Sequence, residues 1–193
     1  MAHSADAAGP GAGRRGAGGV SGGRAVIVLL GAPGSGKSAV GAALGALGFR
    51  WREWEPEIVA RWGSREAFLA RKDEALPALH AEIGRWVAAP GGPAVVESTG
   101  LSDAPLLDTL ARDHACFTVR LDVSEPEAQR RVAARERGRH LSDDADGARA
   151  VWRAFADRVA GVRPCDLVVD TESAGHPAAI AATIERAWRL SRA

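Results

Sequence analysis

The most informative part of this sequence reads Gly31-Ala32-Pro33-Gly34-Ser35-Gly36-Lys37-Ser38. It fits the pattern G-x-x-x-x-G-K-S/T, the phosphate-binding loop known as Walker A. The apolar run Ala25-Val-Ile-Val-Leu-Leu30 precedes it, and small, helix-compatible residues follow from Ala39 to Leu47. A strand, a loop and a helix in this order form the context that the motif requires. The sequence therefore predicts a nucleotide-binding loop and not a glycine-rich turn without a ligand.

Each residue type in this loop has a physical role. Glycines let successive backbone N–H groups converge on phosphate oxygens, and the following helix points its positive end at them. Lys37 can reach the β- and γ-phosphates of a nucleoside triphosphate, and the Ser38 hydroxyl can ligate Mg²⁺. The chain has only two lysines, Lys37 and Lys72, so random drift does not explain a lysine at this position of the motif. We therefore expect ATP and Mg²⁺ as cofactors, with residues 31–38 binding the nucleotide.

Length, charge and cysteine content restrict the remaining possibilities. At 193 residues the chain is predicted to form one domain with a full core. A net charge of +1 gives no global electrostatic case for binding nucleic acid or a membrane surface. No apolar run approaches the roughly 20 residues that span a bilayer. The two cysteines, Cys116 and Cys165, form no C-x-x-C motif and predict no disulfide framework, so a reducing cytoplasm fits.

Residues 1–24 are mostly Gly, Ala, Ser and Arg and offer almost nothing to bury. They are predicted to form a disordered tail before a single domain over residues 25–193. A secretory signal peptide needs an apolar core, which this segment lacks. A transit peptide stays open as the alternative, because three arginines accompany a single acid, although the many glycines disfavour an amphipathic helix.

Strands and helices are predicted to alternate after Arg24. The expected strands cover residues 25–30, 49–53, 94–97, 117–123 and 167–169. Apolar residues at helical spacing between positions 76 and 86 mark a long helical region, which ends at Pro90-Gly-Gly-Pro93. This order implies the α/β class, with a five-stranded parallel sheet and helices on both faces. Ligands of such sheets bind at the carboxyl ends of the strands.

Acidic side chains follow the second predicted strand at that edge of the sheet. Glu53, Glu55 and Glu57 alternate there, next to Trp51 and Trp54. A carboxylate in this place can hold Mg²⁺ through water or accept a proton from an attacking hydroxyl, although any one of the three can equally belong to a solvated turn. The two tryptophans can pack in the core, or one of them can stack on a substrate.

The third predicted strand ends in Glu97-Ser98-Thr99-Gly100. An acid that ends a buried Val-Val strand costs free energy unless it has a partner, and a metal ion or Ser38 would supply one. Glu97 is therefore a candidate for the metal site, together with Ser38 and Glu53. The residues that follow it are candidates for binding the substrate.

A cluster of arginines precedes a polar loop. Residues 130–140 read Arg-Arg-Val-Ala-Ala-Arg-Glu-Arg-Gly-Arg-His, and Leu-Ser-Asp-Asp follows. Arginines on a mobile loop can close over a triphosphate and neutralise the charge that develops in phosphoryl transfer. We expect Arg135, Arg137 and Arg139 to form such a lid; a solvated basic helix end is the alternative. Arg158 is a further candidate for the cleft.

With the phosphate loop, these segments resemble the shikimate kinase-like group of P-loop kinases over nearly the whole folded part. That group has two acids in an Asp-x-Asp-x-x-Ile pattern after its second strand, and Glu53-Trp-Glu-Pro-Glu-Ile58 occupies the pattern here. The resemblance implies that Glu55 holds the acceptor hydroxyl and that Glu53 lies nearer the metal. It also implies that the lid arginines of the group match residues 135–139 and that a further arginine falls near Arg158.

The sequence differs from the pattern of this group at two positions of the substrate site. Its arginine for the substrate carboxylate falls on Leu79, and its Gly-Gly-Gly after the third strand reads Ser98-Thr99-Gly100. The half of the site that binds ATP therefore carries over, and the half that binds shikimate does not. We expect a hydroxyl-rich acceptor without an essential carboxylate.

The sequence thus predicts an ATP- and Mg²⁺-dependent kinase with catalytic roles for Lys37, Glu55, Arg135 and Arg139. The predicted acceptor is a hydroxyl of a small molecule such as a polyol, cyclitol, sugar or hydroxylated antibiotic, and the predicted assembly is a monomer or weak dimer. One alternative is a P-loop ATPase or nucleotide-binding regulator without such an acceptor. The other is a nucleic-acid end kinase, which would need a basic, aromatic-lined channel for the strand.

Overall fold

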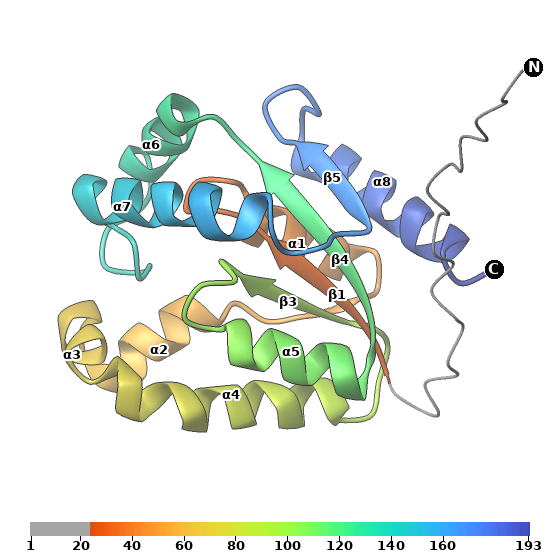
Figure 1. Cartoon of the computed structure of the whole chain (residues 1–193), viewed down its shortest axis with the longest axis horizontal. Helices are drawn as coiled ribbons and strands as arrows, with labels where there is room; N and C mark the ends of the chain where they lie inside the picture. The colour runs from red at the N-terminus through yellow and green to blue at the C-terminus, as the bar shows by residue number, and fades with distance from the viewer. Residues whose placement is uncertain (1–23) are drawn as a thin grey trace, which may run out of the picture.

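A five-stranded sheet forms the centre of the molecule, in a computed structural model that describes residues 24–193 (Figure 1). Its strands are β1 (Ala25–Leu30), β2 (Arg50–Trp51), β3 (Ala94–Ser98), β4 (Ala115–Asp122) and β5 (Leu167–Asp170). All strand pairs are parallel, and the order across the sheet is β2-β3-β1-β4-β5. This confirms the predicted α/β class. The tail predicted over residues 1–24 lies, except for Arg24, outside the described residues.

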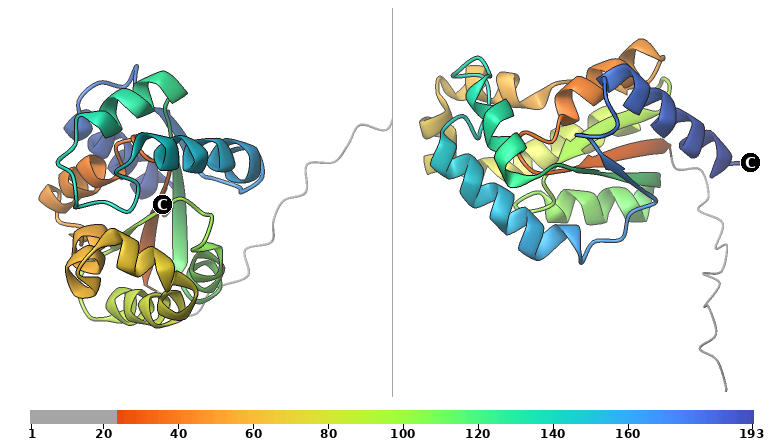
Figure 2. Two further views of the ribbon diagram at one scale, coloured as in Figure 1. Left: turned by 90° about the vertical axis from the view of Figure 1, so that its left-hand side faces the viewer. Right: turned by 90° about the horizontal axis from the view of Figure 1, so that it is seen from above.

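Helices connect the strands and cover both faces of the sheet, as predicted. In the right-hand view of Figure 2, α1 (Lys37–Ala46) and α8 (Pro177–Leu190) lie on one side of the sheet, and α5 (Ala104–Asp113) and α7 (Ala145–Phe155) lie on the other. Among residues 24–193, no helix is long and apolar enough to cross a membrane. The remaining helices are α2 (Trp54–Trp62), α3 (Arg65–Ala70), α4 (Lys72–Ala88), α6 (Glu125–Ala133) and the π-helix η1 (Ala156–Ala160).

The central strand β1 positions the phosphate loop. Its alternate residues enter the two core layers, with Val26 and Val28 in one cluster of buried side chains and Ile27 and Leu29 in the other. A strand that is buried on both faces reads as a continuous apolar run, which explains its sequence. At its carboxyl end the N–H of Gly31 donates to the Ser98 carbonyl oxygen at 3.1 Å, so the loop begins beside the end of β3.

The segment after β2 differs from the prediction. Only Arg50 and Trp51 pair with β3, and α2 begins soon after them with Glu53 as its N-cap. Proline is tolerated in the first turn of a helix, and acids there meet the positive end of the helix dipole, so Glu55-Pro56-Glu57 favours a helix start. The glutamates therefore project from a helical turn and not from an extended strand end.

Candidate active site

The phosphate loop joins β1 to α1 and has a backbone shape that needs glycine. Gly34 and Gly36 have φ angles of 84° and 88°, in the left-handed region that other residues disfavour. A Cβ atom at Gly34 would lie 2.4 Å from the carbonyl oxygen of Ala128 in α6. Residues 31–38 thus form a compact turn at the amino end of α1, an arrangement suited to binding phosphate.

Lys37 is the first residue of α1, and its side chain turns back onto this loop. Its Nζ atom donates hydrogen bonds to the carbonyl oxygens of Gly31 at 2.9 Å and Ala32 at 3.1 Å. Burial lowers the pKa of Lys37, and the negative charges of Glu55 and Glu97 oppose this shift without cancelling it. The ammonium group is therefore held close to the loop and to two carboxylates.

Ser38 and Glu97 form a hydrogen-bonded pair beside the loop. The Ser38 Oγ atom donates to Glu97 Oε2 at 2.8 Å, and the indole Nε1 of Trp51 donates to Glu97 Oε1 at 2.7 Å. Burial raises the pKa of the Glu97 carboxyl, although these hydrogen bonds and the charge of Lys37 oppose the shift. Gly41 makes room for the arrangement, because a Cβ atom there would lie 2.2 Å from Trp51 Nε1.

The oxygens of this pair suit Mg²⁺, which prefers hard oxygen ligands. Within residues 24–193, no three His, Cys, Asp or Glu side chains gather closely enough to hold a metal ion by themselves. In nucleotide sites Mg²⁺ commonly takes one or two protein ligands and completes its shell with phosphate oxygens and water. Ser38 and Glu97 therefore fit such an ion.

Glu53 does not join this pair. Its Oε2 atom faces the loop after α6, where Arg139 Nη2 lies 3.7 Å away, and Arg139 also pairs with Glu136 at 3.1 Å. In the structure it is Glu97, and not Glu53, that is hydrogen-bonded to Ser38, and a metal role of Glu53 stays a prediction. The reason is the strand order, since β3 pairs directly with β1 whereas β2 lies one strand further out.

Glu55 projects from the first turn of α2 toward the phosphate loop. Its Oε2 atom lies 3.1 Å from Nδ1 of His140, and its side chain keeps 44% of its surface exposed. Partial burial raises the pKa of Glu55, but the hydrogen bond to His140 and the charges of Lys37 and Arg135 outweigh it, so the pKa lies below its usual value. His140 is a site residue that was not predicted from the sequence; its position directly after Arg139 was the available signal.

The candidate arginines separate in space. Arg135 lines a small cleft at the phosphate loop together with Lys37 and Glu55. Arg137 lines a different hollow, beside the start of α3. Arg158 is exposed on η1 and does not line the cleft. The structure thus brings Arg135 to the loop, leaves Arg139 paired with glutamates nearby, and leaves the other two outside the cleft.

The residues after β3 divide between a turn and the cleft. Ser98 is 3% exposed, and its Oγ atom accepts a hydrogen bond from the Gly100 N–H at 2.7 Å. Gly100 has a φ angle of 71°, and a Cβ atom there would lie 3.0 Å from Val159 in η1. Thr99 lines the small cleft. The Ser98 hydroxyl is therefore engaged within the turn, and Thr99 is the member of this group that faces the loop.

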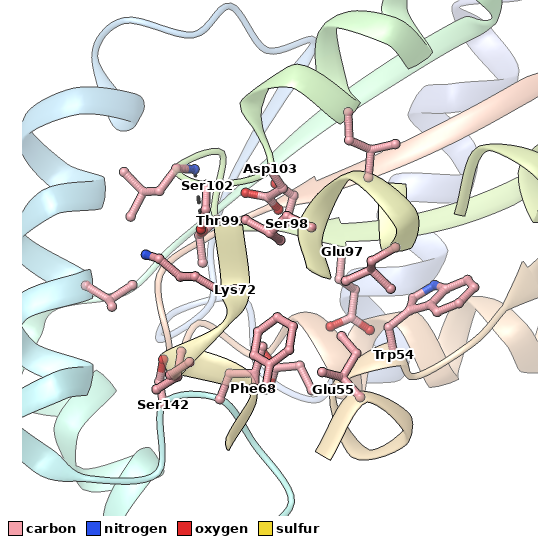
Figure 3. Close-up of a pocket in the computed structure, with 18 of the residues that line it drawn as sticks. Trp54, Glu55, Phe68, Lys72, Glu97, Ser98, Thr99, Ser102, Asp103 and Ser142 are labelled. Carbon is pink, nitrogen blue, oxygen red and sulfur yellow. Dashed lines mark hydrogen bonds between the residues drawn. The ribbon is translucent and has the colours of Figure 1, made fainter. Parts of the chain in front are cut away.

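A larger cavity of about 300 Å³ adjoins the cleft (Figure 3). Glu55 and Glu97 line it together with Trp54, and Figure 3 labels all three. Trp54 is buried, packs edge to face on Trp86 with ring centroids 5.8 Å apart, and carries the Arg52 guanidinium 4.1 Å from its ring centroid. Its indole thus serves as part of the cavity wall.

Comparisons with known proteins identify relatives by structure. No known family model and no curated protein matches the sequence. The shikimate kinase from Acinetobacter baumannii, solved in complex with shikimate, is 18% identical over 88% of this chain and 94% of that chain, with a TM-score of 0.64. A gluconokinase from Sinorhizobium meliloti 1021 is 24% identical over 87% and 94%, with a TM-score of 0.57. The deoxyadenosine kinase from M. mycoides with bound dATP is 14% identical over 85% and 99%, with a TM-score of 0.58.

The chain therefore has a P-loop kinase fold of the shikimate kinase-like kind, which confirms the fold that the sequence resemblance implied. At these identities the likeness establishes the fold, and the chemistry has to be argued from the residues of the site.

Proposed function

We propose that the protein is an ATP- and Mg²⁺-dependent phosphotransferase that acts on a hydroxyl group of a small molecule. The observation that carries the proposal is the convergence of Lys37, Glu55, Arg135 and the Ser38–Glu97 pair on one cleft at the phosphate loop. The adjoining cavity, which Glu55 also lines, supports an acceptor larger than water. The three structural neighbours are each named as kinases of a small molecule, which supports the same class.

In the proposed reaction, residues 31–38 bind the triphosphate, and Ser38 and Glu97 would hold Mg²⁺, which neutralises phosphate charge when bound. The acceptor oxygen forms a bond to the γ-phosphorus while the bond from that phosphorus to the bridging oxygen of ADP breaks. The hydroxyl proton passes to the Glu55 carboxylate, and ADP leaves with the bridging oxygen. Lys37 and Arg135 stabilise the charge on the transferring group.

The surroundings of Glu55 suit orientation of the hydroxyl more than strong base catalysis. A pKa below the usual value keeps the carboxylate ionised at neutral pH and makes it a weak base. Phosphoryl transfer depends mainly on positioning and electrostatic stabilisation, so a carboxylate that aligns the acceptor is sufficient. His140 supports this role by holding the carboxylate from the loop after α6. Arg139, predicted to act in catalysis, contributes here by tying that loop to Glu53.

The test is ADP release from ATP with and without a panel of polyols, cyclitols, sugars and hydroxylated antibiotics, with Lys37→Ala as the background control. Release that depends on an acceptor supports the phosphotransferase. Release that ignores every acceptor would favour the ATPase or regulator, and transfer to the end of an oligonucleotide would favour the nucleic-acid end kinase. The cytoplasmic location and the monomeric or weakly dimeric state remain predictions.

A further inference from the structure

The cavity next to the cleft is lined mainly by apolar side chains. Five of them are buried members of the core cluster on that face of the sheet: Trp54, Ile58, Phe68, Ile83 and Leu106. Leu76 and Leu79 of α4 also belong to this wall and are partly buried against the same cluster. A wall of this kind disfavours a heavily hydroxylated molecule, because hydroxyl groups that leave water without new partners cost free energy.

Polar and charged residues also line the cavity, among them Arg65, Lys72, Thr99, Ser102 and Ser142. The Ser98 hydroxyl already accepts a hydrogen bond from the Gly100 N–H. Three further cavity residues carry a buried polar atom that has no hydrogen-bond partner within residues 24–193: Trp54 Nε1, His80 Nε2 and Asp103 Oδ1. Each of these three atoms is almost inaccessible to solvent, so the cavity surface offers a ligand little of their polarity.

The cavity also opens onto the reacting groups. Lys37, Glu55 and Glu97 line both the cavity and the small cleft at the phosphate loop. Figure 3 labels Glu55 and Glu97 among the residues that line the cavity, together with Phe68 and Trp54. A molecule seated against the apolar wall therefore presents one of its groups to the carboxylates and the loop lysine.

We propose, as an extension of the proposed function, that the acceptor is an alcohol with an apolar body of one or two rings, and not a polyol, cyclitol or sugar. Its reacting hydroxyl lies at Glu55, and its apolar body contacts the wall that contains Leu76 and Leu79. A volume of about 300 Å³ lies at the lower end of the range for ligand cavities, which sets the size of that body. The acceptor class expected from the sequence thus narrows to its least polar members.

Calorimetric titration of the full chain without ATP tests this inference, using naphthalenemethanol and myo-inositol as two alcohols of similar size. Naphthalenemethanol should bind at least about tenfold more tightly, because the burial of apolar surface accounts for its affinity. Leu76→Glu places a carboxylate in the cavity wall and should weaken that binding at least about tenfold. Ala81→Glu adds the same side chain at an exposed position of the same helix, away from the cavity, and should leave binding unchanged.

Both variants should bind a non-hydrolysable ATP analogue as the unmodified protein does, which verifies that they fold. Equal affinity for the two alcohols, or equal binding of naphthalenemethanol by Leu76→Glu and Ala81→Glu, would overturn the inference. The comparison of the two alcohols on the unmodified chain decides the matter even where Leu76→Glu does not fold. Because the titration contains no ATP, it tests binding of the alcohol alone. Binding that depends on Leu76, together with no phosphoryl transfer to the alcohol once ATP is added, would count against the proposed function and not against this inference.

Discussion

Replacing Glu55 by glutamine separates the positioning of the acceptor from the binding of nucleotide. The substitution keeps the shape of the side chain but removes the negative charge that lies beside His140 at 3.1 Å and near Lys37 and Arg135. The amide oxygen can still accept a hydrogen bond, but it cannot take a proton at neutral pH. Turnover should therefore fall, while the affinity for ATP should change little because residues 31–38 keep their geometry.

The expected size of the loss follows from the surroundings of this carboxylate. General acid–base groups contribute about 10²- to 10⁴-fold to enzymatic rates. The low pKa of Glu55 makes it a weak base, so the lower end of this range applies. We expect kcat to fall by about a hundredfold, which corresponds to about 2.7 kcal/mol of activation free energy.

Glu57→Gln is the matched control for this experiment. Glu57 lies on the same helical turn, but its carboxylate accepts a hydrogen bond from Arg52 Nε at 2.7 Å and does not line the cleft. Loss of such a partly exposed ion pair costs less than about 1 kcal/mol of stability, so the variant should still fold. Because Glu57 does not line the cleft, kcat of the folded variant should stay close to that of the unmodified protein. Steady-state ADP release gives kcat, and calorimetry gives the affinity for ATP. Equal kcat values for Glu55→Gln and Glu57→Gln would refute a role of Glu55 at the acceptor.

Three further predictions concern the loop, the lid and the core. Lys37→Ala should lower the transfer rate by at least about a hundredfold while the protein still folds, because the lysine acts on phosphate; a rate equal to that of the unmodified protein would refute its role. Hydrogen exchange across residues 135–147 should slow when a non-hydrolysable ATP analogue binds, whereas equal exchange would indicate a static surface segment. Burial raises the pKa of the Cys116 thiol to about 11, so iodoacetamide should alkylate it about a hundredfold more slowly in the folded protein than in urea. Mass spectrometry of the Cys116 peptide measures both rates, and similar rates would mean that this part of β4 is open to solvent.

The sheet and the phosphate loop could be predicted because their signals are local in sequence. The apolar run of β1 is long enough to form a whole strand of the sheet, and Gly34 and Gly36 occupy positions where the backbone requires positive φ angles. The alternation of strands and helices then implies parallel pairing. The extent of β2 was the exception, because a helix start around Pro56 competes with strand pairing at the edge of the sheet.

The rest of the site depends on contacts between distant segments, for which a single sequence carries no spacing rule. His140 meets Glu55 across 85 positions, and Trp51 meets Glu97 across 46. The place of Glu97 beside Ser38 follows from the strand order, which the sequence did not define. Ser38 could be proposed from the sequence as a partner of Glu97, but the contacts of Trp51 and His140 emerge only from the fold.

The polarity of the acceptor site also depends on contacts between segments that are separate in sequence. A hydroxyl-rich acceptor was expected because Ser98 and Thr99 replace glycines of the resembling group. In the structure the Ser98 hydroxyl is engaged within its own turn, and α2, α3 and α4 contribute apolar side chains to the cavity wall. The surface of the cavity thus depends on how three helices pack beside the end of β3, which their local sequence signals do not define.

Phosphorus NMR of a reaction that contains Mg²⁺, ATP and a panel of alcohols tests the proposed phosphoryl transfer most directly, because it follows the phosphoryl group itself. We predict a new phosphate-monoester resonance of an alcohol that grows in step with ADP, requires that alcohol, and grows more slowly with Glu55→Gln. Inorganic phosphate that grows in step with ADP at the same rate with and without every alcohol would contradict transfer to a hydroxyl acceptor.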